Sequence, residues 1–200
     1  MMVRQIGITG GIGSGKTTVA RKFIDRGFLV YFADDRAKAI YDENEAVKTQ
    51  VKAIAGADVY DEAGRLRRPA LAERIFKDKA LLKQINAVLH PAVARDYAAW
   101  IEAIPASYDR PFVMKEAAIL MEVGNHLPLQ GTITVYAPKS IRIKRVISRD
   151  SSSSEQVLSR MANQWSDFPK MQQADFILFN DGIHPIDPQI EAAIKQFSPS

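Results

Sequence analysis

The feature that most constrains this chain is a glycine-rich octapeptide close to its N-terminus. Residues 10–17 read Gly-Gly-Ile-Gly-Ser-Gly-Lys-Thr and match the pattern G-x-x-x-x-G-K-[ST] at every fixed position. An apolar run at residues 6–9 precedes the octapeptide, and residues 17–24 follow it with helical spacing. A buried strand, a glycine-rich turn and a helix start are the context in which this pattern forms a phosphate loop. The sequence therefore predicts a parallel α/β fold that binds a nucleoside triphosphate.

The chemistry of such a loop depends on its backbone as much as on its side chains. Glycines let the chain curl so that successive N–H groups point into one anion-binding hollow, and the positive end of the next helix adds to their attraction. Lys16 is expected to bridge the β- and γ-phosphates, and Thr17 to give its hydroxyl to Mg²⁺. A glycine-rich turn that binds nothing is the alternative. The expected nucleotide-binding residues are Gly11, Ile12, Gly13, Ser14, Gly15, Lys16, Thr17 and Thr18.

Composition limits the remaining possibilities. The chain has 200 residues, 46% of them hydrophobic, which suits one domain with room for a small inserted subdomain. It has no cysteine, so disulfides, cysteine-based zinc sites and thiol catalysis are excluded. Neither a signal-peptide pattern nor an apolar stretch of about 20 residues is present, so we expect a cytoplasmic protein without a membrane partner.

The formal net charge of +4 allows two interpretations. A basic surface is ordinarily just solvated, but it also attracts a polyanionic substrate. Basic residues interleaved with aromatic ones are not found in any run, so nucleic acid is not an expected partner.

Strand-like and helical segments alternate along most of the chain. Apolar runs predict strands at residues 3–9, 28–33, 112–115, 132–136 and 176–180. Helical spacing predicts helices at residues 17–26, 34–41, 78–104, 140–149 and 155–165. This alternation is typical of a three-layer α/β fold of the P-loop NTPase kind, with a parallel sheet and the phosphate loop at the carboxyl ends of the strands.

Two stretches depart from the alternation. Residues 42–104, approximately, are mostly helical without a convincing strand, and we interpret them as an insertion that binds substrate; ordinary helices packed on the sheet are the alternative. Within it, Arg68-Pro69 has the character of a helix start. The serine run 151–154 reads either as a loop that caps the next helix or as the tip of a mobile lid over residues 140–165.

Charged residues outside the loop decide what the chain does with a nucleotide. Asp34 follows the second strand, where a carboxylate could accept a proton from a substrate hydroxyl or hold Mg²⁺ through water; a helix N-cap is the alternative. Arg142, Arg145 and Arg149 are spaced to share one helix face, and Arg160 follows the serine run. Such a row could stabilise a transferring phosphoryl group, or it could be a solvated face.

Three further residues carry weaker signals. His90 precedes a proline within a helical region, and it could contact a ligand or simply pack. Glu116 and Glu122 follow the third strand, Glu122 within an expected helix, and either could orient substrate or metal or be surface charge. Residue type alone does not separate these roles.

Six blocks, in order along nearly the whole chain, resemble those of the dephospho-coenzyme A kinases. They comprise residues 9–20, Ala33-Asp34, residues 64–76, His90-Pro91, the pattern Arg145, Arg149-Asp150 and Arg160-x-x-x-Gln164, and residues 174–182. The loop by itself is generic, whereas the ordered set is specific. The resemblance implies transfer of the ATP γ-phosphate to the ribose 3′-hydroxyl of dephospho-CoA, the last step of CoA synthesis.

The resemblance also implies roles for residues and segments. It implies a helical CoA-binding insertion at about residues 42–104 and an arginine lid at about 140–165. Asp34 becomes the expected general base, while Lys16, Arg145 and Arg149 would stabilise the transferring phosphoryl group. Asn180 is the implied contact to the adenine region. The implied contacts to the substrate are Asp34, His90, Glu122 and Arg160.

This chain departs from the family pattern in two places. Phe32 stands where the family has the first Asp of Asp-Ala-Asp, and strand alternation would put Phe32 on the same side as Asp34. Residues 116–122 read Glu-Ala-Ala-Ile-Leu-Met-Glu where the family has D-x-P-L-L-x-E. Another small-molecule kinase stays an alternative. A nucleotide-operated switch is a second, although the chain lacks the Asn-Lys-x-Asp by which GTPases read guanine.

Overall fold

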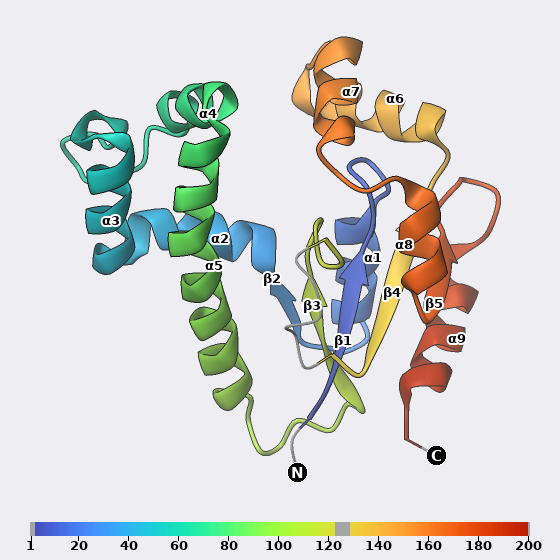
Figure 1. Ribbon diagram of the computed structural model, residues 1–200. Coiled ribbons are helices and arrows are strands. Elements are labelled where there is room, and N and C mark those ends of the chain that lie inside the picture. The colour runs from blue at the N-terminus through green and yellow to red at the C-terminus, as the bar shows by residue number, and fades with distance from the viewer. Residues whose placement is uncertain (1–2, 123–128, 200) are drawn as a thin grey trace. The chain divides into compact units, whose positions relative to one another are not determined.

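The expected strands form one parallel sheet. The computed structural model describes residues 3–122 and 129–199, and within them it contains a five-stranded sheet of order β2-β3-β1-β4-β5 (Figure 1). All of the neighbouring strands run parallel. The strands are β1 (Arg4–Thr9), β2 (Val30–Phe32), β3 (Phe112–Glu116), β4 (Gly131–Tyr136) and β5 (Phe176–Phe179).

Helices cover both faces of this sheet. Helices α1 (Lys16–Ile24) and α9 (Ile186–Phe197) contribute to a core with the apolar residues of one face, among them Ile8 and Ile133, which are register partners. On the opposite face, the Thr134 hydroxyl donates to a backbone carbonyl of α8 (Asp167–Gln173). The expected α/β architecture is thereby confirmed, and the loop after β1 lies at the carboxyl edge of the central strand.

Two further helices lie between β4 and α8, namely α6 (Lys139–Asp150) and α7 (Ser154–Ala162). Ser151 closes α6 in the left-handed region, with φ of 51°. Ser153 then caps α7, because its hydroxyl accepts from the Gln156 N–H while the Gln156 side chain accepts from the Ser153 N–H. The serine run is therefore the cap predicted for this position.

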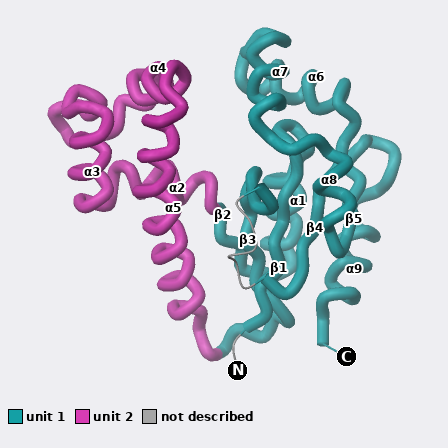
Figure 2. Tube along the Cα trace, in the orientation of Figure 1, with its two compact units in different colours: residues 1–32, 107–200 teal, residues 33–106 magenta. Residues whose placement is uncertain are grey.

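The chain divides into two compact units, Met1–Phe32 with Ser107–Ser200 (unit 1) and Ala33–Ala106 (unit 2) (Figure 2). Unit 1 holds the sheet. Unit 2 is helical and has an apolar core of its own, to which Val51 and Ile85 contribute. Its elements are α2 (Ala33–Glu43), α3 (Glu45–Ala55), the short 3₁₀ helix η1 (Ala57–Val59), α4 (Arg68–Lys77) and α5 (Lys79–Glu102).

Local signals explain where the helices of unit 2 begin. The Asn44 side chain caps α3 by accepting from the Val47 N–H, and Asp78 caps α5 by accepting from two N–H groups of its first turn. Pro69 stands in the first turn of α4, as its fixed φ and missing N–H favour. The long helix α5 contains Pro91 without ending there.

The sequence-based expectation for the end of β2 was wrong. Strand β2 stops at Phe32, and Ala33 already belongs to α2, so Asp34 is a first-turn helical residue. Strand alternation therefore does not relate Phe32 to Asp34, and it does not put them on one side. Acidic residues favour the first turn of a helix, where Asp34 and Asp35 meet the positive end of its dipole, and this favours an early helix start.

Other boundaries also differ from expectation. The single helix expected at residues 155–165 ends at Ala162, and α8 and α9 were not predicted. Glu116 is the last residue of β3, and Glu122 lies in a turn and not in a helix. Among the described residues, no helix combines the length and the apolar character needed to cross a membrane.

Candidate active site

The glycine-rich loop joins β1 to α1 and curls tightly. Gly13 and Gly15 have φ of 80° and 87°, values that favour glycine. Neighbouring groups also leave no room for side chains, since a Cβ on Gly13 would lie 2.5 Å from the carbonyl oxygen of Arg142. A Cβ on Gly15 would overlap the side-chain amide of Asn180. The glycines thus meet both a conformational and a packing requirement.

The loop leads into a helix start that suits an anion. Helix α1 begins at Lys16, and the N–H groups of its first turn have no carbonyl partner earlier in the helix. The Ser14 hydroxyl is buried, and within the described part of the chain it has no hydrogen-bond partner. Helix N-terminal N–H groups, a cationic side chain and an unsatisfied hydroxyl together form a site for phosphate oxygens.

A buried carboxylate contacts the two side chains expected to do the chemistry of the loop. Glu116 Oε1 lies 3.2 Å from Lys16 Nζ, and the Thr17 hydroxyl donates to the same oxygen over 3.2 Å. Glu116 is only 2% exposed, and its register partner on β1 is Ile8, just ahead of the loop. From its sequence context alone, Glu116 carried little weight, because only the pairing of β1 with β3 brings it to the loop.

The hydroxyl and carboxylate oxygens also suit a metal ion. Mg²⁺ prefers oxygen ligands and usually keeps some of its waters alongside one or two protein groups and substrate phosphates. Thr17 and Glu116 supply two such oxygens beside the loop. The donor set therefore fits the ion that the motif predicts.

Asn180 and Arg145 reach the loop from the other side. The Asn180 side-chain N–H donates to the Ser14 carbonyl over 2.8 Å, which connects the end of β5 to the loop. Arg145 makes longer contacts, of 3.4 Å each, to the Ser14 carbonyl and to the Asn180 side-chain oxygen. Both predicted site residues therefore lie at the loop, although Asn180 uses its amide on the loop backbone.

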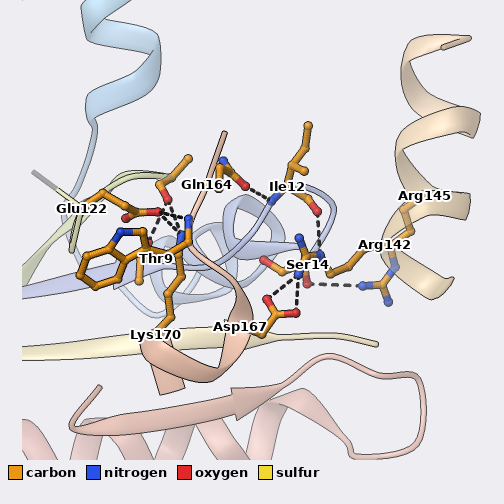
Figure 3. Close-up of polar contacts among 11 residues, drawn as sticks. Thr9, Ile12, Ser14, Glu122, Arg142, Arg145, Gln164, Asp167 and Lys170 are labelled. Carbon is orange, nitrogen blue, oxygen red and sulfur yellow. Dashed lines mark hydrogen bonds and ion pairs between the residues drawn. The ribbon is translucent and has the colours of Figure 1, made fainter. Parts of the chain in front are cut away.

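Arg142 is not part of a solvated or ligand-facing row. Its guanidinium is buried, forms an ion pair with Asp167 and donates from Nε to the Ile12 carbonyl over 2.9 Å. The Ile12 N–H in turn donates to Gln164 Oε1 over 2.8 Å. Figure 3 shows these contacts around Ile12. Arg142, Arg145 and Arg149 were expected to share one helix face that either stabilises a transferring phosphoryl group or is solvated. Arg142 fits neither alternative, because Asp167 and the Ile12 carbonyl engage its buried guanidinium.

Arg149 and Arg160 converge on one carboxylate. Asp150 accepts from both Nε and Nη2 of Arg149 and also from Arg160, which ties the end of α6 to α7. The hydrogen bond from Arg149 lowers the pKa of the Asp150 carboxyl below its ordinary value. Both arginines are more than half exposed, so this cluster faces solvent.

Glu122 is engaged within unit 1. Its Oε1 lies 2.8 Å from the ammonium of Lys170, a residue of α8 that has no solvent exposure. Lys170 also donates to the Ala118 carbonyl, and the Thr9 hydroxyl donates to that same oxygen (Figure 3). The contacts hold the turn after β3 against α8, a structural role that its sequence context did not indicate.

Two predicted substrate contacts, Asp34 and His90, belong to unit 2. Asp34 lies in the first turn of α2. His90 is exposed on α5 and lines an open depression of 540 Å³ that also carries two cationic side chains. The other lining residues are Lys79, Leu82, Lys83, Asn86, Ala87 and Pro91.

Comparison with known proteins points to one family. A family model described as dephospho-CoA kinase matches residues 4–185. A dephospho-CoA kinase of Porphyromonas gingivalis is 37% identical over 191 residues, covering 95% of this chain and 92% of that protein. One of Salinibacter ruber is 38% identical over 177 residues, with 88% of each chain covered.

Solved structures agree with the fold. The crystal structure of TT1252 from Thermus thermophilus matches with a TM-score of 0.82 and 34% identity, covering 98% of this chain and 96% of that one. A dephospho-CoA kinase from Campylobacter jejuni has a TM-score of 0.63 at 23% identity, with 99% of both chains covered, which speaks to the fold.

Proposed function

The chain belongs to the dephospho-CoA kinase family, and from this premise we propose how its residues divide the work of the reaction. The enzyme is a kinase that phosphorylates dephospho-CoA with ATP, the last step of CoA biosynthesis. One observation carries the assignment of residues: a single buried carboxylate, Glu116, contacts both Lys16 and Thr17 at the phosphate loop.

ATP binds through the phosphate loop in this proposal. The N–H groups of Gly13 and of residues 15–18, with the positive end of α1, take the β- and γ-phosphate oxygens, whereas the Ser14 N–H already donates to the Gly11 carbonyl. The buried Ser14 hydroxyl finds its partner among the phosphate oxygens. Lys16 exchanges its contact with Glu116 for one with the phosphates. Asn180, through its position at the end of β5, lies toward the adenine region.

Thr17 and Glu116 would hold Mg²⁺, either directly or through water. When bound, the ion neutralises negative charge on the phosphate oxygens. The proximity of Glu116 to Lys16 makes the same carboxylate a counter-charge for the lysine in the absence of nucleotide. One side chain thereby serves two states of the site.

The acceptor is the ribose 3′-hydroxyl of dephospho-CoA. Its oxygen forms the new bond to the γ-phosphorus while the bond from that phosphorus to the β–γ bridging oxygen breaks, which releases ADP. Asp34 takes the hydroxyl proton. Lys16, Arg145 and Arg149 stabilise the charge on the transferring group.

Unit 2 supplies the binding surface for the rest of dephospho-CoA. The depression on α5 presents Lys79 and Lys83 beside His90, and the two lysine ammonium groups suit a pyrophosphate. Arg160 contributes a further cation from α7, and residues 140–165 act as a lid that excludes water. Glu122 acts on the substrate side indirectly, by holding the turn after β3 on Lys170.

Product analysis by mass spectrometry tests the reaction. ATP with Mg²⁺ and dephospho-CoA should give a product heavier by one phosphate, whereas AMP, adenosine and shikimate should not. Turnover with one of these rival acceptors, and none with dephospho-CoA, would refute dephospho-CoA as the acceptor.

Substitution tests the residue roles. Lys16→Ala and Asp34→Asn should each lower kcat by about 10²- to 10⁴-fold, since they remove electrostatic stabilisation and the base, respectively. Asp35→Asn is the matched control, because Asp35 is an exposed neighbour that pairs with Lys38. Near wild-type turnover in Asp34→Asn would show that another group accepts the proton.

A further inference from the structure

Both backbone groups of one phosphate-loop residue are held by side chains from a distant segment. The Ile12 N–H donates to Gln164, 152 residues further along the chain, and the Ile12 carbonyl accepts from Arg142, 130 residues further. The distances, 2.8 Å and 2.9 Å, are those of good hydrogen bonds. Neither contact involves the expected catalytic groups, which are Lys16, Asp34, Arg145 and Arg149.

Arg142 is itself fixed on several sides. Its side chain is only 7% exposed, and Asp167 neutralises it with both carboxylate oxygens. A Cβ on Gly11 would overlap this guanidinium, and a Cβ on Gly13 would meet the Arg142 carbonyl oxygen. Arg142 therefore lies against three consecutive loop positions, and in this arrangement it leaves no room for a Cβ at Gly11 or Gly13.

The two side chains that hold Ile12 also bracket a functional segment. Arg142 precedes and Gln164 follows the stretch that carries Arg145, Arg149 and Arg160. Both ends of that stretch are thereby tied to a single residue of the loop. The position of the loop and the base of the arginine-bearing segment are set by the same contacts.

We propose that Arg142, Asp167 and Gln164 form a loop clamp, a set of positioning residues that orders the phosphate loop before the nucleotide arrives. The inference rests on the proposed binding of ATP at this loop. With the Ile12 N–H and carbonyl both satisfied, Ile12 does not itself bind phosphate, and the N–H groups of Gly13 and of residues 15–18 do so, since the Ser14 N–H donates to the Gly11 carbonyl. Ordering a loop in advance lowers the entropic cost of binding, so the clamp strengthens affinity for the nucleotide and not for the acceptor.

Three variants separate the clamp from general stability. Gln164→Ala frees the Ile12 N–H while leaving the buried ion pair intact. The double variant Arg142→Gln with Asp167→Asn removes both charges of the ion pair together, so the buried Arg142 cation is not left unpaired. Lys144→Gln is the control, because it removes one exposed cation from the same helix as Arg142.

Hydrogen exchange and calorimetry on the intact protein provide the two main readouts, and steady-state kinetics adds the KM values. Hydrogen exchange at the Ile12 amide, followed by NMR without ligand, should speed up about tenfold or more in Gln164→Ala. Calorimetry with ADP should show binding weakened about tenfold in Gln164→Ala and in the double variant, as the loss of one hydrogen bond predicts. KM for ATP should rise in parallel, while KM for dephospho-CoA and both readouts in Lys144→Gln stay at wild-type values.

The outcomes distinguish this inference from the proposed function. An affinity for ADP within twofold of wild type in both clamp variants would overturn the clamp. Binding of ADP by the wild-type protein would in that case still support the nucleotide site. Absence of ADP binding in the wild-type protein would instead count against the nucleotide site, and Ile12 exchange would then decide the clamp alone. If the double variant fails to fold, Gln164→Ala, which keeps every buried charge paired, decides between the outcomes.

Discussion

A buried lysine in the central part of the sheet should lower the free energy of unfolding at neutral pH, compared with an apolar residue at the same position. Lys115 lies in β3, is 4% exposed and has its ammonium 5.8 Å from the centre of the Tyr31 ring. Burial lowers the pKa of Lys115 from 10.5 to about 8. Because the charged form is disfavoured in the folded state, folding at pH 7 carries an electrostatic cost. Lys115→Met keeps the length of the side chain and removes that cost.

The size of the effect follows from the pKa shift. At pH 7 the lysine is protonated in both states, so nearly the whole shift counts, about 3 kcal/mol at about 1.4 kcal/mol per unit. The cation–π contact with Tyr31 offsets about 1 kcal/mol of this. Lys115→Met should therefore raise the free energy of unfolding by about 2 kcal/mol at pH 7.

The pH dependence has a fixed sign. A lysine whose folded pKa is depressed binds fewer protons in the folded state between pH 8 and 10.5, so the wild type gains stability as pH rises through this window. About 2 kcal/mol of the electrostatic cost should have disappeared by pH 9.5. The advantage of the Lys115→Met variant should shrink by a similar amount.

Urea unfolding followed by circular dichroism at pH 7 and pH 9.5 measures both quantities. Lys144→Met, which removes an exposed cation, is the matched control and should change stability by less than about 0.5 kcal/mol at either pH. A Lys115→Met variant no more stable than wild type at pH 7, or an advantage that stays constant between the two pH values, would refute the reasoning.

Two further predictions concern the site. Glu116→Gln should raise the Mg²⁺ concentration needed for half-maximal activity by about tenfold and lower kcat, since an amide binds Mg²⁺ less well than a carboxylate. Titration of activity with Mg²⁺ measures this concentration, and an unchanged value would show that Glu116 does not bind the metal. Gly13→Ala should weaken ADP binding by at least about tenfold, because φ of 80° costs about 1–2 kcal/mol for alanine and the alanine Cβ would meet the Arg142 carbonyl. Calorimetry measures the affinity for ADP, and a wild-type affinity in this variant would contradict the loop geometry.

The sequence predicted those parts of the fold and site that local signals specify. The phosphate-loop pattern carries its own conformational requirement, so its glycines and the start of α1 were predictable from eight residues. The apolar runs likewise located the strands, since buried parallel strands are continuously apolar. The predicted end of β2 was wrong because an apolar run does not show that the next helix already begins at Ala33, within that run.

The rest of the site depends on register and on tertiary partners. Glu116 reaches Lys16 only because β3 pairs with β1 in a register that sets Glu116 opposite Ile8. The burial of Arg142 depends on Asp167, which lies 25 residues away beyond a turn that periodicity did not reveal. Helical spacing put Arg142 and Arg149 on one face, but spacing cannot say which guanidinium becomes buried against a carboxylate.

The carboxylate partners divide the arginines of α6 and α7 into two kinds. Arg149 and Arg160 are 65% and 51% exposed where they share Asp150, and exposed ion pairs of this type contribute about 0–1 kcal/mol each. Arg142 is 7% exposed on Asp167, and breaking a buried pair by removing one partner costs about 3–5 kcal/mol. A phosphate group can therefore draw Arg149 away from Asp150 at little cost, whereas it cannot draw Arg142 away from Asp167. The same residue type, seven positions apart on one helix, thus forms an exposed, exchangeable ion pair in one place and a fixed part of the scaffold in the other.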